Sequence, residues 1–86
     1  MTFEELKEKA KEIFEDRCDT SSELIIGISF ENYELYFRKD GSIDVEFPIG
    51  IHNVGGLDIS EERTYEQMYQ IMLALDYEQH FRAAGR

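Results

Sequence analysis

The alternation of apolar and polar residues between positions 23 and 47, interrupted at two short polar segments, constrains the fold most strongly. Such alternation is typical of strands with one face on a core and the other in water. It predicts three strands joined by tight turns into an antiparallel meander. The apolar positions are Leu24, Ile26, Ile28 and Phe30, then Tyr33, Leu35 and Phe37, and finally Ile43, Val45 and Phe47.

The alternation also selects the second turn, because residues directly opposite each other in an antiparallel pair share a face. A two-residue loop at Asp40-Gly41 would place acidic residues opposite Leu35 and Phe37. A three-residue loop, Lys39-Asp40-Gly41, with Gly41 at positive φ, avoids this. The resulting pairs are Phe37 with Ile43, Leu35 with Val45, and Tyr33 with Phe47.

The first turn requires a two-residue loop, Glu31-Asn32, to keep the apolar residues of both strands on one face. We expect Asn32 to adopt the left-handed conformation that such loops use.

This register predicts an acidic surface on the solvent side of the sheet. Glu34 lies opposite Glu46, and Asp44 lies beside them, across Tyr36. Tyr36 itself lies opposite Gly27, so its ring can cover the bare backbone there. Like charges directly opposite each other cost about 0.2–1 kcal/mol, so folding alone does not require them. The surface is either a recognition site for a cationic partner or a solvated face that keeps a small domain soluble.

The segment before the sheet predicts a helix. Thr2 and Glu5 have the spacing of a capping box. Apolar residues then recur at helical spacing, which predicts a helix from Phe3 to Arg17. Residues 19–22 are expected to link this helix to the sheet.

The C-terminal segment predicts a second amphipathic helix, with Ser60 or Thr64 as its N-cap. Asp76 falls in the middle of its apolar face, so we expect a break there and a short last helix from Tyr77 to Ala84. Residues 49–59, after Pro48, contain either a short extra strand or a packed loop.

Two amphipathic helices can cover the apolar face of a three-stranded meander. The sequence therefore predicts a single α+β domain over residues 1–86, with two layers in the order α-β-β-β-α.

The net charge of −10 is concentrated in the middle of the chain. Residues 23–62 hold nine acidic and two basic residues, for −7. This disfavours direct binding to nucleic acid or to an anionic membrane and favours a basic protein surface. The single cysteine, the lack of a signal pattern and the lack of a long apolar run predict a cytoplasmic protein.

No residue pattern in the sequence predicts a catalytic or metal site. Cys18, His52 and His80 lie in three segments, without the spacings of zinc ligands. Carboxylates on a flat solvated face lack the burial that catalytic pairs need. We therefore expect no enzymatic activity, cofactor or metal. Asp58, Glu61 and Glu62, ahead of the second helix, form a second acidic cluster, which is either helix-end chemistry or part of a binding surface.

Two families resemble this chain in architecture. The element order is similar to that of double-stranded-RNA-binding domains, but acidic residues replace their basic cluster at the second helix. Small size, acidity and the helix–three strands–helix order also resemble certain small anti-CRISPR proteins from phages. The local similarity is the acidic start and aromatic-methionine body of residues 59–72. That resemblance implies inhibition of RNA-guided nucleases by carboxylates placed where DNA binds.

The sequence thus favours an acidic, non-enzymatic inhibitor that mimics nucleic-acid charge on a basic, nucleic-acid-binding protein. A toxin-immunity protein and a small self-associating regulatory domain are the alternatives, and monomer or dimer is undecided. The predicted partner-binding residues are Glu34, Tyr36, Asp44, Glu46, Asp58, Glu61 and Glu62.

Overall fold

The computed structural model describes residues 1–56 and 64–84, with side chains at positions 1–50 and 64–80. Helix α1 (Phe3–Phe14) continues into a 3-10 turn, η1 (Glu15–Arg17), and α2 (Thr64–Ala84) follows the sheet. The strands are β1 (Cys18–Asp19), β2 (Ile25–Ser29), β3 (Glu34–Arg38), β4 (Ser42–Phe47) and β5 (Gly50–Gly56). All pair antiparallel, in chain order. The predicted α+β class is confirmed.

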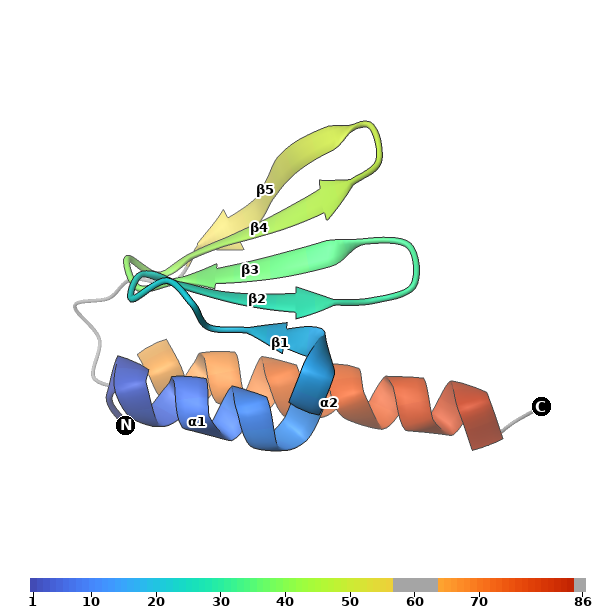
Figure 1. Cartoon of the computed structure of the whole chain (residues 1–86), viewed down its shortest axis with the longest axis horizontal. Coiled ribbons are helices and arrows are strands. Elements are labelled where there is room, and N and C mark those ends of the chain that lie inside the picture. The colour runs from blue at the N-terminus through green and yellow to red at the C-terminus, as the bar shows by residue number, and fades with distance from the viewer. Residues whose placement is uncertain (57–63, 85–86) are drawn as a thin grey trace.

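Both helices lie on one side of the sheet, side by side along β1 and β2, and the β4–β5 hairpin extends farthest from them (Figure 1). The buried core joins the apolar stripes of both helices to β2 and β3. Its residues are Phe3, Leu6, Ala10, Phe14, Ile26, Ile28, Phe37, Met68 and Met72.

The sheet is larger than the predicted meander of three strands. The short β1 overlaps the expected linker only at Asp19, and it pairs Cys18 with Ile28 and Asp19 with Gly27. At the other edge, β5 pairs with β4. Of the two alternatives for residues 49–59, the described part of that segment therefore forms a strand.

Both predicted turn lengths are confirmed. Phe37 pairs with Ile43 around the three-residue loop, and Gly41 has φ +93°. In the first turn the Phe30 amide donates to the Tyr33 carbonyl at 2.8 Å, which closes the two-residue loop. The prediction of a left-handed conformation at Asn32 is wrong. Among the described residues, Glu15 is the one non-glycine residue with positive φ.

Leu24 also departs from its predicted burial and is 60% exposed. It precedes β2, and its carbonyl accepts a hydrogen bond from the Lys39 amide at 2.8 Å. The backbone thus continues the pairing, while the side chain lies outside the packed layer.

The helix ends differ from the prediction in two places. The capping box of α1 is present, with Thr2 and Glu5 exchanging hydrogen bonds of 3.1 Å, but the α-helix ends at Phe14. In contrast to the expected break, α2 runs through Asp76. The carboxylate of Asp76 faces Arg17 at 3.7 Å and His80 at 3.3 Å, so this part of the helix packs without placing an uncompensated charge in the core.

Candidate functional site

The carboxylates of Glu34 and Glu46 converge on one tyrosine on the outer face of the sheet. The two glutamates are direct partners in the β3–β4 ladder, as predicted. The Tyr36 hydroxyl lies 2.5 Å from Glu34 Oε2 and 2.8 Å from Glu46 Oε2. We call Glu34 and Glu46 the carboxylate pair.

The Tyr36 ring is positioned by a glycine, as the register predicted. Gly27 is its partner across β2–β3, and a Cβ added at Gly27 would lie 3.3 Å from Tyr36 Cε1. That contact is tighter than ordinary van der Waals packing. The bare backbone at Gly27 therefore leaves room for the ring, and the Tyr36 hydroxyl reaches the two carboxylates.

One phenol hydrogen serves two carboxylates, because a tyrosine hydroxyl is a single donor. The hydrogen bond to Glu34, and to a smaller extent the one to Glu46, raises the pKa of Tyr36 well above its ordinary value of 10.0. At any moment one carboxylate oxygen lies close to the phenol oxygen without receiving its hydrogen. Ser29 Oγ lies 3.4 Å from the other oxygen of Glu34.

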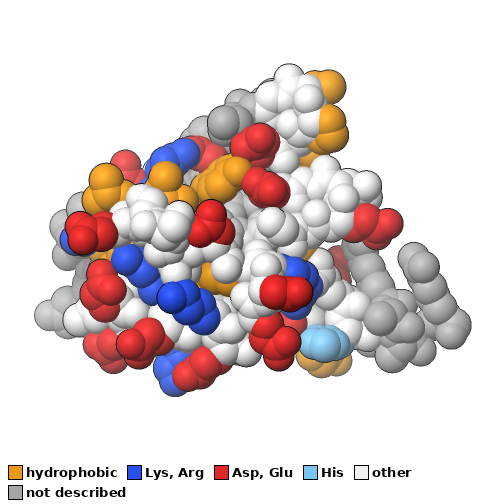
Figure 2. Space-filling model, viewed as in Figure 1, with side chains coloured by type: hydrophobic (Ala, Val, Ile, Leu, Met, Phe, Trp, Pro, Cys, Tyr) orange, Lys and Arg blue, Asp and Glu red, His pale blue; other side chains and the backbone are white. Residues whose placement is uncertain are grey.

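No described side chain neutralises the charge of Glu34 and Glu46. Among the side chains that the structure describes, no lysine, arginine or histidine forms an ion pair with Glu34 or Glu46. Glu34 is exposed and Glu46 is half-buried, so both remain accessible from solution. Figure 2 shows acidic side chains over the strands as well as over the helices.

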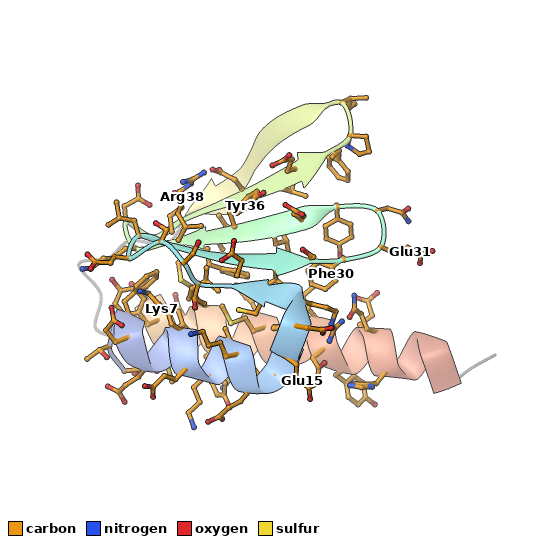
Figure 3. The ribbon with its side chains drawn as sticks, in the orientation of Figure 1. Lys7, Glu15, Phe30, Glu31, Tyr36 and Arg38 are labelled. Carbon is orange, nitrogen blue, oxygen red and sulfur yellow. The ribbon has the colours of Figure 1, made fainter. Side chains whose placement is uncertain are left out.

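Asp44 departs from the prediction of a bare acidic residue. Arg38 Nε donates to Asp44 Oδ2 at 2.8 Å, so an arginine of the same face neutralises this carboxylate. Figure 3 shows Arg38 and Tyr36 on the sheet. On the described part of the sheet, the acidic surface without ion pairs is therefore narrower than predicted and centres on Glu34 and Glu46.

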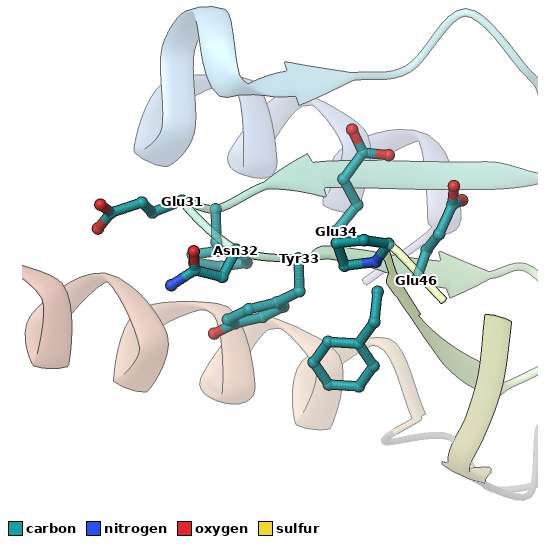
Figure 4. Close-up of a pocket in the computed structure, with 8 residues that line it drawn as sticks. Glu31, Asn32, Tyr33, Glu34 and Glu46 are labelled. Carbon is teal, nitrogen blue, oxygen red and sulfur yellow. The ribbon is translucent and has the colours of Figure 1, made fainter. Parts of the chain in front are cut away.

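A hollow that the sequence did not predict adjoins the pair (Figure 4). It has a volume of about 560 Å³ and lies where the β2–β3 and β4–β5 turns meet. Its lining residues are Phe30, Glu31, Asn32, Tyr33, Glu34, Glu46, Phe47 and Pro48. The available signal was Phe47 followed by Pro48, which places an apolar residue at a strand end, where the helices do not cover it.

The second predicted acidic cluster, Asp58, Glu61 and Glu62, lies outside the described residues, as does the side chain of His52. Burial, more than the neighbouring Asp19, raises the pKa of the Cys18 thiol, which opposes thiolate chemistry. Among the side chains that the structure describes, no cluster of three metal-ligating groups occurs. No helix in the described part of the chain has the length and hydropathy needed to cross a membrane.

Comparisons with protein-family models, curated proteins and solved structures found no match to this chain. The function proposed for this chain therefore rests on the chemistry of the carboxylate pair.

Proposed function

We propose that this protein is a non-enzymatic inhibitor that docks on a basic, nucleic-acid-binding protein through the outer face of its sheet. The observation that carries the proposal is the pair of Glu34 and Glu46, held side by side by Tyr36 and without an ion pair to any described lysine, arginine or histidine. Like charges in this position cost stability, and a cationic partner would reverse that cost.

The arrangement supports mimicry of nucleic-acid charge. A basic groove that binds phosphates presents lysine and arginine side chains, and carboxylates can occupy the phosphate positions. Tyr36 limits the movement of both acidic side chains, which lowers the entropy lost when they are bound. The net charge of −10 attracts such a surface from a distance and speeds association.

The partner would be a nuclease that binds nucleic acid through a basic surface. In the anti-CRISPR-like form it is an RNA-guided nuclease, and in the toxin-immunity form it is a toxin nuclease. Both forms use the same chemistry, so one assay compares them.

The test is a competition assay with labelled DNA, in which fluorescence anisotropy measures the bound DNA at about 0.05 M and about 0.3 M NaCl. The chain is added to a guide-loaded RNA-guided nuclease and, separately, to a toxin nuclease. We expect displacement of DNA from one of them at low salt and much weaker displacement at high salt. The double variant E34Q/E46Q should associate about tenfold more slowly than the unchanged chain.

The matched control is E8Q/E12Q, which removes the same number of charges from exposed positions on α1. It should compete nearly as well as the unchanged chain. Equal loss of competition in both double variants would show that only total charge matters, and the proposed sheet site would be wrong. Failure to displace DNA from either enzyme would reject inhibition of these two enzymes.

A further inference from the structure

The outer edge of β5 is the part of the sheet best placed to receive another chain. The strand order puts β5 at one edge of the sheet and the two-residue β1 at the other. Among the described elements β5 pairs with β4 alone, and the β4–β5 hairpin extends farthest from both helices (Figure 1). An edge strand directs alternate N–H and C=O groups away from its sheet, where a further strand can bind them.

The sequence of β5 lacks the residues that usually block an edge. Soluble proteins protect their edge strands with lysine, other charged residues or proline. The segment 50–56 contains none of these, although it is seven residues long. Its ladder with β4 is regular from Gly50 to Asn53 and shifts register beyond that point. Residues 50–53 are therefore the part of β5 on which another strand can pair.

On the outer face, a strand added beyond β5 would approach the carboxylate pair. Ile51 is the ladder partner of Glu46, and Glu46 is the partner of Glu34. A residue of the added strand opposite Ile51 would lie in the same row, about 10 Å from the Cα of Glu46. A lysine or arginine side chain at that position can extend toward the Glu46 carboxylate, which forms no ion pair with a described cation.

On the helix side, the same added strand would approach an aromatic ring. Gly50 is the ladder partner of Phe47, whose side chain is 41% exposed. Phe47 lies 6.1 Å from Tyr33, and Figure 4 shows Tyr33 on the opposite side of the sheet from the carboxylate pair. A Cβ built on Gly50 would meet no described atom within 4 Å. An apolar side chain of the added strand can therefore approach Phe47 across the bare backbone of Gly50.

These two requirements fall on neighbouring residues of the added strand, because successive side chains of a strand point to opposite faces. The residue opposite Ile51 should be basic, and the residue opposite Gly50 should be apolar. A second copy of β5 does not meet the first requirement, because residues 50–56 include no lysine or arginine. Repulsion between two chains of net charge −10 also opposes self-pairing.

We infer that β5 binds an extended segment of the partner protein in which basic and apolar residues alternate. The segment adds one strand to the sheet, so that backbone hydrogen bonds supply affinity and the two faces supply specificity. The inference rests on the proposed function for the source of this segment. It extends the docking surface from the carboxylate pair to the edge of the sheet.

The test titrates the isotope-labelled chain with the peptide acetyl-Gly-Arg-Val-Arg-Val-Arg-Gly-amide and follows the backbone amides by NMR. We expect saturable shifts centred on residues 50–53 and on Glu46 and Phe47, and slower hydrogen exchange within residues 50–53. A peptide of the same composition, with its arginines and valines in separate blocks, cannot present the two faces together. It should bind about tenfold more weakly.

A methylated peptide separates strand pairing from charge attraction. N-methylation of the arginines and valines removes the backbone donors but keeps every positive charge. This peptide should lose the shifts on residues 50–53. Undiminished binding of the methylated peptide would show that charge alone drives the association, and would overturn the inference.

Glu46→Gln should weaken binding of the alternating peptide about fivefold, since it removes one exposed ion pair. Glu12→Gln is the matched control, because it removes the same charge from an exposed position on α1. Its affinity should equal that of the unchanged chain. Phe47→Ala should weaken binding about fivefold through the other face. If Phe47→Ala disturbs the fold, Glu46→Gln alone decides the result.

Shifts spread over the whole acidic surface, or equal weakening by the two glutamine variants, would overturn the inference. Concentration-dependent shifts of residues 50–53 without added peptide would show that a second copy occupies the edge, and would also overturn it. The titration contains no nuclease, so its failure is distinguishable from failure of the competition assay.

Discussion

Tyr36 is the residue on which the geometry of the candidate site depends. Its ring needs the bare backbone of Gly27, and its hydroxyl lies within hydrogen-bond distance of Glu34 and Glu46. Without that donor the two carboxylates would face each other across β3 and β4 with only repulsion between them. One side chain thus stabilises the sheet and positions its charges.

Tyr36→Phe should therefore lower the free energy of unfolding by about 1 kcal/mol near neutral pH, since hydrogen bonds to charged groups contribute about this much at partly exposed sites. Urea unfolding measures the change. The control is Tyr69→Phe, because the structure gives the Tyr69 hydroxyl no hydrogen bond with any described residue. An equal loss in both variants would contradict the role of Tyr36.

The same substitution has a pH dependence of known sign. The pKa of Tyr36 is raised in the folded chain, so its stabilising effect is complete below the ordinary value of 10.0 and is lost as pH rises through the folded pKa. The advantage of the unchanged chain over Tyr36→Phe should stay constant from about pH 7 to about pH 9 and decrease above that range.

Alternation in the sequence predicted which face each of these residues occupies, but not how the side chains pair. It placed Tyr36 across Gly27 and Glu34 opposite Glu46, because register follows from the pattern. The Arg38–Asp44 ion pair and the sharing of one hydroxyl depend on side-chain conformation, which a period of two does not specify. The hollow was missed for a related reason, since the pattern assigned Phe47 to the core without showing where helix cover ends.

At the scale of elements, the 3-10 turn η1 follows α1 in the chain and contacts α2 through Arg17. Arg17 donates to Gln79 Oε1, lies 3.7 Å from Asp76 and places its guanidinium 5.3 Å from the Phe14 ring centroid. The predicted helix break at Asp76 is wrong, because Arg17, which lies far from Asp76 in the sequence, contacts Asp76 and Gln79. A helical wheel includes only the residues of its own helix.

Arg17→Met keeps most of the aliphatic packing but removes the charge beside Asp76. It should lower the free energy of unfolding by about 1 kcal/mol, a value reduced for the partial exposure of both side chains. Lys9→Met, at an exposed position on α1, is the charge-matched control and should change stability little. In a double-mutant cycle with Asp76→Asn, strictly additive losses would mean that Arg17 and Asp76 do not interact.

At the scale of the whole molecule, the chain has nineteen acidic and nine basic residues, so repulsion between negative charges opposes the compact state. The ion pairs Arg38–Asp44, Arg17–Asp76 and Lys7–Glu4 act in the opposite direction. Salt screens both effects. Exposed pairs contribute little, and an excess of ten negative charges remains after every cation has been paired, so we expect repulsion to dominate.

The free energy of unfolding should therefore increase by about 1 kcal/mol between about 0.02 M and about 0.5 M NaCl at neutral pH. Urea unfolding at several salt concentrations measures this increase, and a decrease would mean that the ion pairs dominate. The variants E34Q/E46Q and E8Q/E12Q carry the same net charge, so a general effect reduces the salt response equally in both. A larger reduction in E34Q/E46Q would locate the repulsion at the carboxylate pair, where binding of a cationic partner would relieve it.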